Sequence, residues 1–426
     1  VEVQPKYFGF TDDAPPEWAR FKLATETSRY VTLLTKEPPW VVASYFLAWP
    51  WRRVATPYHE QKLILAQLAA NGAAPMVNLS GGPPKVHEDP RGFQATEELY
   101  TFMADRPEVF EGDESAATVA LVYSEGCSNL ATRIGRSRDL YVFGFHATEN
   151  LLDEAHIAYD IVSADDLGRV ASDRYDVVVL PAASVLSDAA IAALESHVRA
   201  GTGLVAWGDP GRFDADGTVR TGAPLGGLLG AESIEEAGGL IEAAGDVGAA
   251  QAYLRIVGAP SAGARDAAPL TEGIPAVYVP AAGPWWKAVS SAGTVAPVVR
   301  GPAFRVFPEG LSYPEDEPGD PIVLASGSRG DAPRVVFMAF DAGHSAGRTA
   351  HPDSARLVTN AVSWASRAPQ AVSLAGFPDV LLSLRRNGRS LWVHLVNTTG
   401  RQRLLTAFTP VFDLPLEVDA RMPLAA

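Results

Sequence analysis

Seven side chains within the first 90 residues have types and positions suited to chemistry on a sugar: Glu26, Trp49, Trp51, Arg52, His59, Asn78 and His87. Glu26 is the candidate catalytic residue, because a carboxylate at the end of a barrel strand can act as nucleophile or charge stabiliser. The other six are candidate substrate-binding residues: flat indole rings suit the apolar C–H faces of a sugar, and the polar groups suit its hydroxyls.

This assignment has alternatives at each position. Trp49 and Trp51 could instead be core or interface residues, and Glu26 could be a solvated or salt-bridged loop carboxylate. A glycosidase also needs a second carboxylate about 5–10 Å from the first, and this segment does not clearly supply one. Asp12 and Asp13 are candidates only if residues 7–15 form another strand-end loop.

The elements that must position these residues alternate between strands and helices. We predict strands at 21–27, 40–49 and 74–80 and helices at 57–72 and 93–106. This order predicts a parallel α/β unit, in which Glu26 would end one strand, and Trp49 and Asn78 would end the next two. The strands are too few to close a sheet, so we expect residues 1–112 to be the C-terminal portion of a (β/α)8 barrel.

The rest of the chain comprises two further predicted regions. Residues 116–368 predict a flavodoxin-like, doubly wound domain with a Gly/Ala/Pro-rich insertion from about residue 233. Residues 370–426 open with a hairpin around Asn387-Gly388 and predict a β-rich, sandwich-like tail that is truncated. The overall fold class is therefore α/β.

The doubly wound domain lacks the residues for the reactions that such folds often perform. The strand "VVVL" at 177–180 runs into Pro181, Ala182 and Ala183, where an amidotransferase would carry its cysteine nucleophile. Cys127 follows a different strand, so we interpret it as an inert thiol. The loop at 124–137 has no phosphate-binding pattern, and the eight histidines show no metal-ligand spacing. We expect neither a cofactor nor a metal.

Composition excludes several classes of partner. The 426 residues carry a formal net charge of −15 with 47% hydrophobic residues, which argues against nucleic acid and anionic membrane surfaces. No apolar stretch approaches the ~20 residues of a membrane helix. A single cysteine excludes an internal disulfide. Without a signal peptide after Val1 we expect a cytoplasmic protein, and we expect the chain to be part of a longer frame.

The stretch from Tyr175 to Arg220, "YDVVVLPAASVLSDAAIAALESHVRAGTGLVAWGDPGRFDADGTVR", resembles the β-galactosidase trimerisation domain of glycoside hydrolase family 42 and its relatives. The features that carry the resemblance are the strand ending in Leu-Pro, Leu186-Ser187 before the helix, "VRAGTGLVAWGD", and "FDADG" followed by Arg220. Residues 351–365 and 390–400 also resemble the C-terminal parts of such proteins.

The resemblance implies an amidotransferase-like domain that has lost its nucleophile and helps to assemble a trimer or dimer. It also implies a glycosidase that acts on a carbohydrate substrate by a retaining two-glutamate mechanism, with Glu26 as the one position offered for the nucleophile. We expect the full barrel to hydrolyse O-glycosidic bonds and this chain alone to be inactive. The rival hypotheses are a non-catalytic oligomerisation or carbohydrate-binding protein and a nucleotide-binding flavodoxin-like protein.

Overall fold

The computed structural model describes residues 2–3, 22–35, 37–46, 53–79, 89–111, 114–240, 250–256, 269–275, 278–291, 295–306, 321–327, 333–399 and 415–420. The chain divides into two compact units, each built from separate stretches. The first unit comprises Val1–Ala117, Leu152–Ile161 and Gln370–Ala426, and the second comprises Thr118–Leu151 and Val162–Pro369. The boundaries of the three predicted domains stay a prediction.

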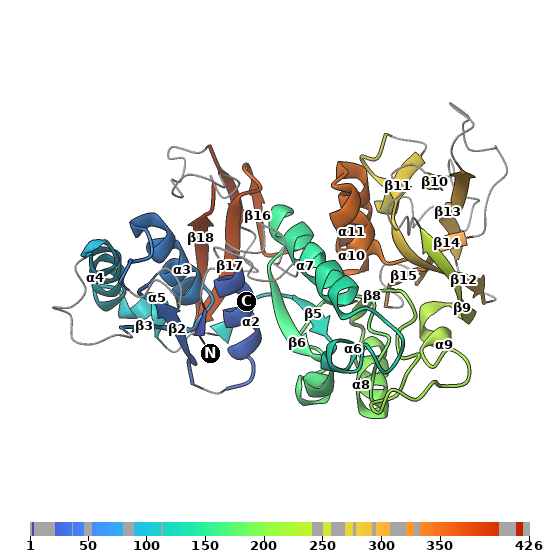
Figure 1. Ribbon diagram of the computed structural model, residues 1–426, viewed down its shortest axis with the longest axis horizontal. Helices are drawn as coiled ribbons and strands as arrows, with labels where there is room; N and C mark the ends of the chain where they lie inside the picture. The colour runs from blue at the N-terminus through green and yellow to red at the C-terminus, as the bar shows by residue number, and fades with distance from the viewer. Residues whose placement is uncertain are drawn as a thin grey trace. The chain divides into compact units, whose positions relative to one another are not determined.

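The first unit opens with a parallel sheet whose strand order is β1-β2-β3, with helices between and after the strands (Figure 1). This arrangement matches the predicted alternation of strand and helix. The elements are β1 (Glu2–Val3), α2 (Leu23–Val31), β2 (Trp40–Ser44), α3 (Tyr58–Ala70), β3 (Ala74–Asn78), α4 (Arg91–Ala104) and α5 (Pro107–Phe110).

The strand predicted at 21–27 is wrong, because residues 23–27 lie in helix α2. The alternation of Phe21, Leu23 and Thr25 suggested period two, but burial in the structure follows helical spacing. Ala24, Ser28 and Val31 are all buried and lie four and three positions apart, so they share one face of a helix. The hydroxyl of Thr25 donates a 2.7 Å hydrogen bond to Gln67 of α3, which fixes that face against its neighbour.

Five short strands complete the first unit as its β-rich part. The strand pair β17–β18 is a hairpin that also pairs with β4. Its apolar side chains Leu381 and Val396 pack against Leu63 and Ala70 of α3. The elements are β4 (Glu114–Ser115), β16 (Val372–Ala375), β17 (Val380–Asn387), β18 (Ser390–Asn397) and β19 (Glu417–Ala420).

The predicted hairpin is confirmed, with its turn one residue further along. Asn387 pairs with Ser390, so the two-residue loop is Gly388-Arg389 rather than Asn387-Gly388. Gly388 has φ 56°, the positive value that the first loop residue of the favoured hairpin turns requires.

A nine-stranded sheet has the order β11-β10-β13-β14-β15-β8-β7-β5-β6; its strands belong to the second unit, except for Tyr159–Ile161 of β6, which fall in the first. Strands β5, β7, β8 and β15 are parallel to one another, and the order of the last five strands is one of the two common orders of doubly wound sheets. The elements of this part are β5 (Val119–Tyr123), α6 (Glu125–Asn129), α7 (Arg138–Glu154), β6 (Tyr159–Ser163), η3 (Ala164–Arg169), β7 (Val177–Leu180), α8 (Asp188–Arg199), β8 (Gly203–Trp207), α9 (Gly226–Leu229), β15 (Val335–Met338), α10 (Ala342–Thr349) and α11 (Pro352–Ala365).

Helix α8 shows how local sequence sets these boundaries. The Ser187 hydroxyl caps the helix by accepting a hydrogen bond from the backbone N–H of Ala190. Gly201, with φ 98°, reverses the chain into β8. Ala190, Leu194 and Val198 form the buried stripe of this helix.

The Gly/Ala/Pro-rich segment extends the same sheet with antiparallel strands. Strands β10, β11, β13 and β14 join its edge beside β15, while β9 and β12 form a separate pair. The elements are β9 (Ala231–Leu240), β10 (Ala250–Ile256), β11 (Tyr278–Ala281), β12 (Gly283–Ser290), β13 (Val295–Val306) and β14 (Pro321–Ser326). In the part of the chain that the structure describes, no helix is long and apolar enough to span a bilayer.

Candidate functional site

The structure describes three of the seven predicted site residues. Asn78 is the last residue of β3, as expected, and His59 lies in the first turn of α3 with its ring 4.9 Å from that of Tyr58. Glu26 is half-buried in the first turn of α2, so the argument that placed it at a strand end no longer holds and its catalytic role stays a prediction. Trp49, Trp51, Arg52 and His87 lie outside the described residues, as do Asp12 and Asp13.

The carboxyl ends of β2 and β3 meet in a small cluster of aromatic and polar groups. Ser44 is in register with Asn78, and the backbone N–H of Tyr45 donates a 3.1 Å hydrogen bond to the carbonyl of Asn78. The Tyr45 ring lies 4.6 Å from that of Phe93. A Cβ at Gly92 would meet the Tyr45 ring at 2.6 Å, so only glycine fits beneath this ring.

A carboxylate that the sequence analysis did not select joins this cluster. Asp89 precedes α4, and both its oxygens accept hydrogen bonds from the Arg91 guanidinium, at 2.8 and 2.6 Å. The Arg91 hydrogen bonds lower the pKa of Asp89, and burial raises the pKa of the Tyr45 phenol, with the Asp89 charge adding to that rise. Asp89 is therefore anionic at neutral pH, and its charge contributes to the raised pKa of Tyr45.

The sequence carried a signal for only one of these two residues. Asp89 lies between the third predicted strand and its helix, which is the edge where barrel enzymes place their functional groups. Tyr45 falls inside the strand predicted at 40–49, whereas β2 ends at Ser44. Glu60, buried in the first turn of α3, is a further carboxylate at this end of a helix. We call Tyr45, Asn78 and Asp89 the strand-end cluster.

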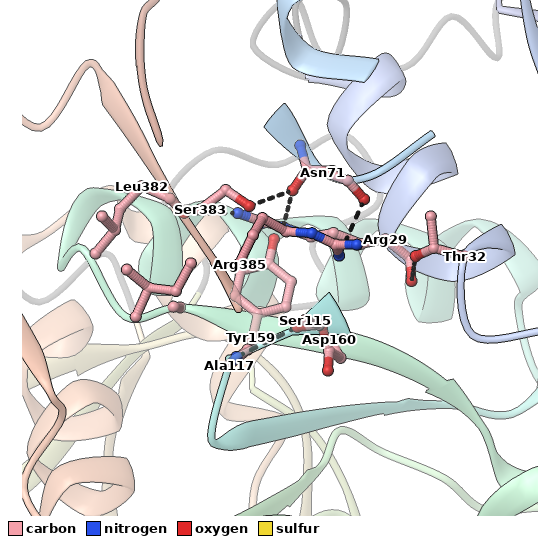
Figure 2. Close-up of a pocket in the computed structure, with 12 residues that line it drawn as sticks. Arg29, Thr32, Asn71, Ser115, Ala117, Tyr159, Asp160, Leu382, Ser383 and Arg385 are labelled. Atoms are coloured by element: carbon pink, nitrogen blue, oxygen red, sulfur yellow. Dashed lines mark hydrogen bonds between the residues drawn. The ribbon is translucent and has the colours of Figure 1, made fainter. Parts of the chain in front are cut away.

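A second polar group of the first unit surrounds Arg29 (Figure 2). The Asn71 side-chain oxygen accepts hydrogen bonds from Arg29 and Ser383, at 3.2 and 3.0 Å, while its backbone carbonyl accepts one from Arg385. The Arg29 guanidinium lies 4.1 Å from the centre of the Tyr159 ring. The cavity between these side chains has a volume of about 10 Å³, which is room for no more than one water molecule.

Arg29 also belongs to a buried ion cluster. Asp153 is contacted by Lys22 at 3.0 Å and by Arg29 at 2.9 Å, and all three side chains are at most 7% exposed. Burial raises the pKa of Asp153, but the two cations outweigh burial, so the net shift is downward. Asp153 partly neutralises both cations, and the adjoining cavity is too small for a substrate. We therefore assign this cluster a role in stabilising the unit.

In the second unit, the turn after β7 keeps an unusual backbone without a nucleophile. Ala182 has φ 42°, a conformation that non-glycine residues rarely adopt. The Cys127 sulfur approaches the Ala182 carbonyl at 3.8 Å and accepts a 3.2 Å hydrogen bond from the backbone N–H of Val185. Burial raises the pKa of that thiol to about 11. The thiol is protonated at neutral pH, and Ala182, the residue with the unusual backbone, carries only a methyl group, so the geometry agrees with our rejection of amidotransferase chemistry.

Beside this turn lies a chain of charged contacts. The Ser184 hydroxyl donates to Asp209 at 2.5 Å, Arg136 contacts the other Asp209 oxygen at 2.7 Å, and Arg136 also contacts Glu236 at 3.1 Å. Burial raises the pKa of Asp209, while Arg136 and Ser184 lower it, and burial prevails. The guanidinium thus bridges a buried and an exposed carboxylate.

Comparisons with known proteins place the fold. No family model matches the sequence, and no curated protein matches it. Among solved structures, the chain is similar to alpha-L-fucosidase isoenzyme 2 from Paenibacillus thiaminolyticus, with 16% identity and a TM-score of 0.65 over 99% of this chain and 58% of that one.

Two β-galactosidases are similar to the same extent. For the enzyme from Rahnella sp. R3 the identity is 17% and the TM-score 0.63, over 92% of this chain and 54% of that one. For a GH42 β-galactosidase from G. stearothermophilus the values are 13% and 0.64, over 92% and 52%. The chain spans little more than half the length of these proteins, and over that length it has the fold of GH42 β-galactosidases and related glycoside hydrolases.

Proposed function

We propose that this chain is part of a glycoside hydrolase that acts on β-galactosides or chemically similar sugars. The observation that carries the proposal is the likeness to a fucosidase and to β-galactosidases over 92–99% of the chain, at TM-scores of 0.61 to 0.65. The β-galactosidases include GH42 members, which is the group that the stretch from Tyr175 to Arg220 resembles.

The strand-end cluster supports a sugar site at the carboxyl ends of β2 and β3. Tyr45 and Asn78 bring an aromatic ring and an amide to one edge of the sheet, and Asp89 adds an ionised carboxylate. Because Arg91 lowers the pKa of Asp89, this group suits hydrogen bonding to hydroxyls or stabilisation of positive charge. It does not suit the role of general acid, which needs a raised pKa.

Glu26 remains the proposed nucleophile from the sequence, now without the support of a strand end. A retaining glycosidase needs two carboxyl groups about 5 Å apart. In a longer chain that closes the barrel, Glu26→Gln is expected to abolish hydrolysis while sugar binding is kept. Full hydrolysis in that variant would assign the nucleophile to another residue.

The first experiment is sugar binding by the chain itself. We expect a galacto-configured iminosugar, which mimics the transition state of glycoside cleavage, to bind in calorimetry, and p-nitrophenyl glycosides to be cleaved slowly or not at all. Asp89→Asn should weaken binding about tenfold, because a hydrogen bond to a charged group contributes about 1.5–3 kcal/mol.

Asp105→Asn is the matched control, because Asp105 is exposed at the other end of the same helix. Binding that is unchanged by both Asp89→Asn and Asn78→Ala would contradict the proposed site. Failure of the folded chain to bind any glycoside or iminosugar would contradict the proposed function. The predicted homo-oligomer is a separate proposal, which light scattering tests.

A further inference from the structure

The second unit holds two adjoining cavities at the edge where its parallel strands end. One has a volume of about 390 Å³ and reaches Ala182, Ser184 and Asp341; the other, of about 480 Å³, reaches Phe213 and Val219. Both volumes lie in the range of about 300–1,000 Å³ that is usual for small-molecule sites.

The two cavities share three lining residues, Arg136, Glu236 and Trp286. Glu236 is 58% exposed and so presents its carboxylate to a ligand. Trp286 is 3% exposed, and its indole N–H is buried and has no hydrogen-bond partner among the residues that the structure describes. A buried donor that lacks a partner is costly, and a ligand acceptor reaching it would remove that cost.

We propose that these cavities form a binding site for a small neutral polyhydroxylated molecule, such as a monosaccharide. All the residues involved belong to the second unit, so the site is additional to the strand-end cluster and does not depend on the proposed function. Each hydroxyl of a sugar donates one hydrogen bond and accepts others. Arg136 offers N–H donors directly beside the acceptor oxygens of Asp209 and Glu236, which matches two adjacent hydroxyls.

The apolar walls fit the same ligand. Phe213, Val219 and Trp286 also line the larger cavity, with the Arg136 guanidinium 5.8 Å from the centre of the Trp286 ring. The C–H face of a sugar ring can pack on these apolar side chains. The site therefore presents the two kinds of surface that a sugar presents, polar edges and an apolar face.

The charges argue against other ligand classes. The residues that line the cavities include two cations, Arg136 and Arg212, and four carboxylates, those of Asp209, Glu235, Glu236 and Asp341. An anion such as phosphate would meet net negative charge. A cation that approached Asp209 or Glu236 would meet the Arg136 guanidinium, which contacts these carboxylates at 2.7 and 3.1 Å and would repel it.

The test uses the whole chain labelled with 5-fluorotryptophan. The fluorine signal of Trp286 is assigned by its loss in Trp286→Phe, and galactose and glucose are then titrated. We expect a saturable shift of this signal. Glu236→Gln should weaken the binding about tenfold through the loss of a charged hydrogen-bond acceptor, and Val219→Phe should weaken it by filling the larger cavity.

Glu195→Gln is the matched control, because Glu195 is also an exposed partner of an arginine, on α8. It should leave the titration unchanged. The proposal is wrong if neither sugar shifts the signal, if both cavity variants bind like the parent chain, or if only the amine-bearing galactosamine produces a shift, which would indicate a cation site.

One further variant separates this site from the strand-end cluster. Asn78→Ala should leave the Trp286 titration unchanged; if it removes the shift, the signal does not report on the cavities and the proposal fails. Loss of iminosugar binding in Asp89→Asn, with no response at Trp286, would keep the proposed function and reject the cavity site.

Discussion

The buried cluster of Asp153 with Lys22 and Arg29 gives the sharpest stability prediction. Asp153→Asn keeps the size of the side chain but leaves two cations buried without their counter-charge. Breaking a buried ion pair from one side costs about 3–5 kcal/mol. Arg29 keeps its hydrogen bonds to Asn71 and to the Leu382 carbonyl, so we expect a loss of about 3 kcal/mol in the free energy of unfolding.

The matched control is Glu98→Gln in the same unit. Glu98 contacts Lys62 at 2.6 Å, closer than either contact of Asp153, but these side chains are 38% and 44% exposed. Lys62 lowers the pKa of Glu98 to about 2, yet solvent screens an exposed pair, and such pairs contribute at most about 1 kcal/mol. Burial rather than distance should therefore decide which variant is less stable.

The assay is urea-induced unfolding, with hydrogen exchange of the α2 and β17 peptides to localise the effect to the first unit. The pH dependence has a definite sign. Because the pKa of Asp153 is lowered in the folded state, its contribution is complete above the ordinary carboxyl pKa near 3.9 and is lost as the pH falls through the folded value. A cost in Asp153→Asn no larger than in Glu98→Gln would refute this reasoning.

Three further predictions concern the second unit. Burial raises the pKa of Asp341 to about 6, so the free energy of unfolding should fall by roughly 1–3 kcal/mol as the pH rises from about 4 to about 6. Asp341→Asn, which can still cap α10, should remove this decline in denaturation curves measured at several pH values. Cys127, with its thiol pKa raised to about 11 by burial, should resist iodoacetamide at pH 8 in the native state and react once urea unfolds the chain; rapid native alkylation would contradict the assigned burial. Ala182→Gly should relieve about 1 kcal/mol of backbone strain at φ 42°, and Ala183→Gly, at a neighbouring buried position, should only destabilise; equal losses of melting temperature would contradict this.

Patterns of short range predicted most elements correctly. Helix α3 ends at Asn71-Gly72 and α8 begins at Ser187, as their capping residues indicate. The helix α2 was missed because a short segment with alternating apolar residues fits either period. What decided it was packing of Ala24 and Val31 in one core with residues of α3, together with the hydrogen bond from Thr25 to Gln67, which are contacts that no local pattern contains.

The candidate site likewise contains residues that the sequence could have predicted and contacts that it could not. Asp89 could have been found, since it lies between a predicted strand and its helix, two residues before its partner Arg91. Tyr45 could not, because the strand was predicted to run to residue 49 and β2 ends at Ser44. The charged contact between Arg136 and Asp209 could not, because nothing in the sequence relates a loop after the first strand to a residue that follows β8. Contacts of this kind depend on the order of the strands in the folded sheet, which local sequence patterns do not contain.

The division of the first unit into three stretches has a consequence for the order of folding during synthesis. Arg29 donates a hydrogen bond to the carbonyl of Leu382, 353 positions later, and Leu63 packs against Leu381. On the ribosome, α2 and α3 emerge long before β17. The two helices can share a core with β2 early, but the contacts of Arg29 and Leu63 with β17 form only after the second unit has been translated. The second unit can therefore fold before these contacts form, and contacts of such high sequence separation are expected to make closure of the first unit the slow step.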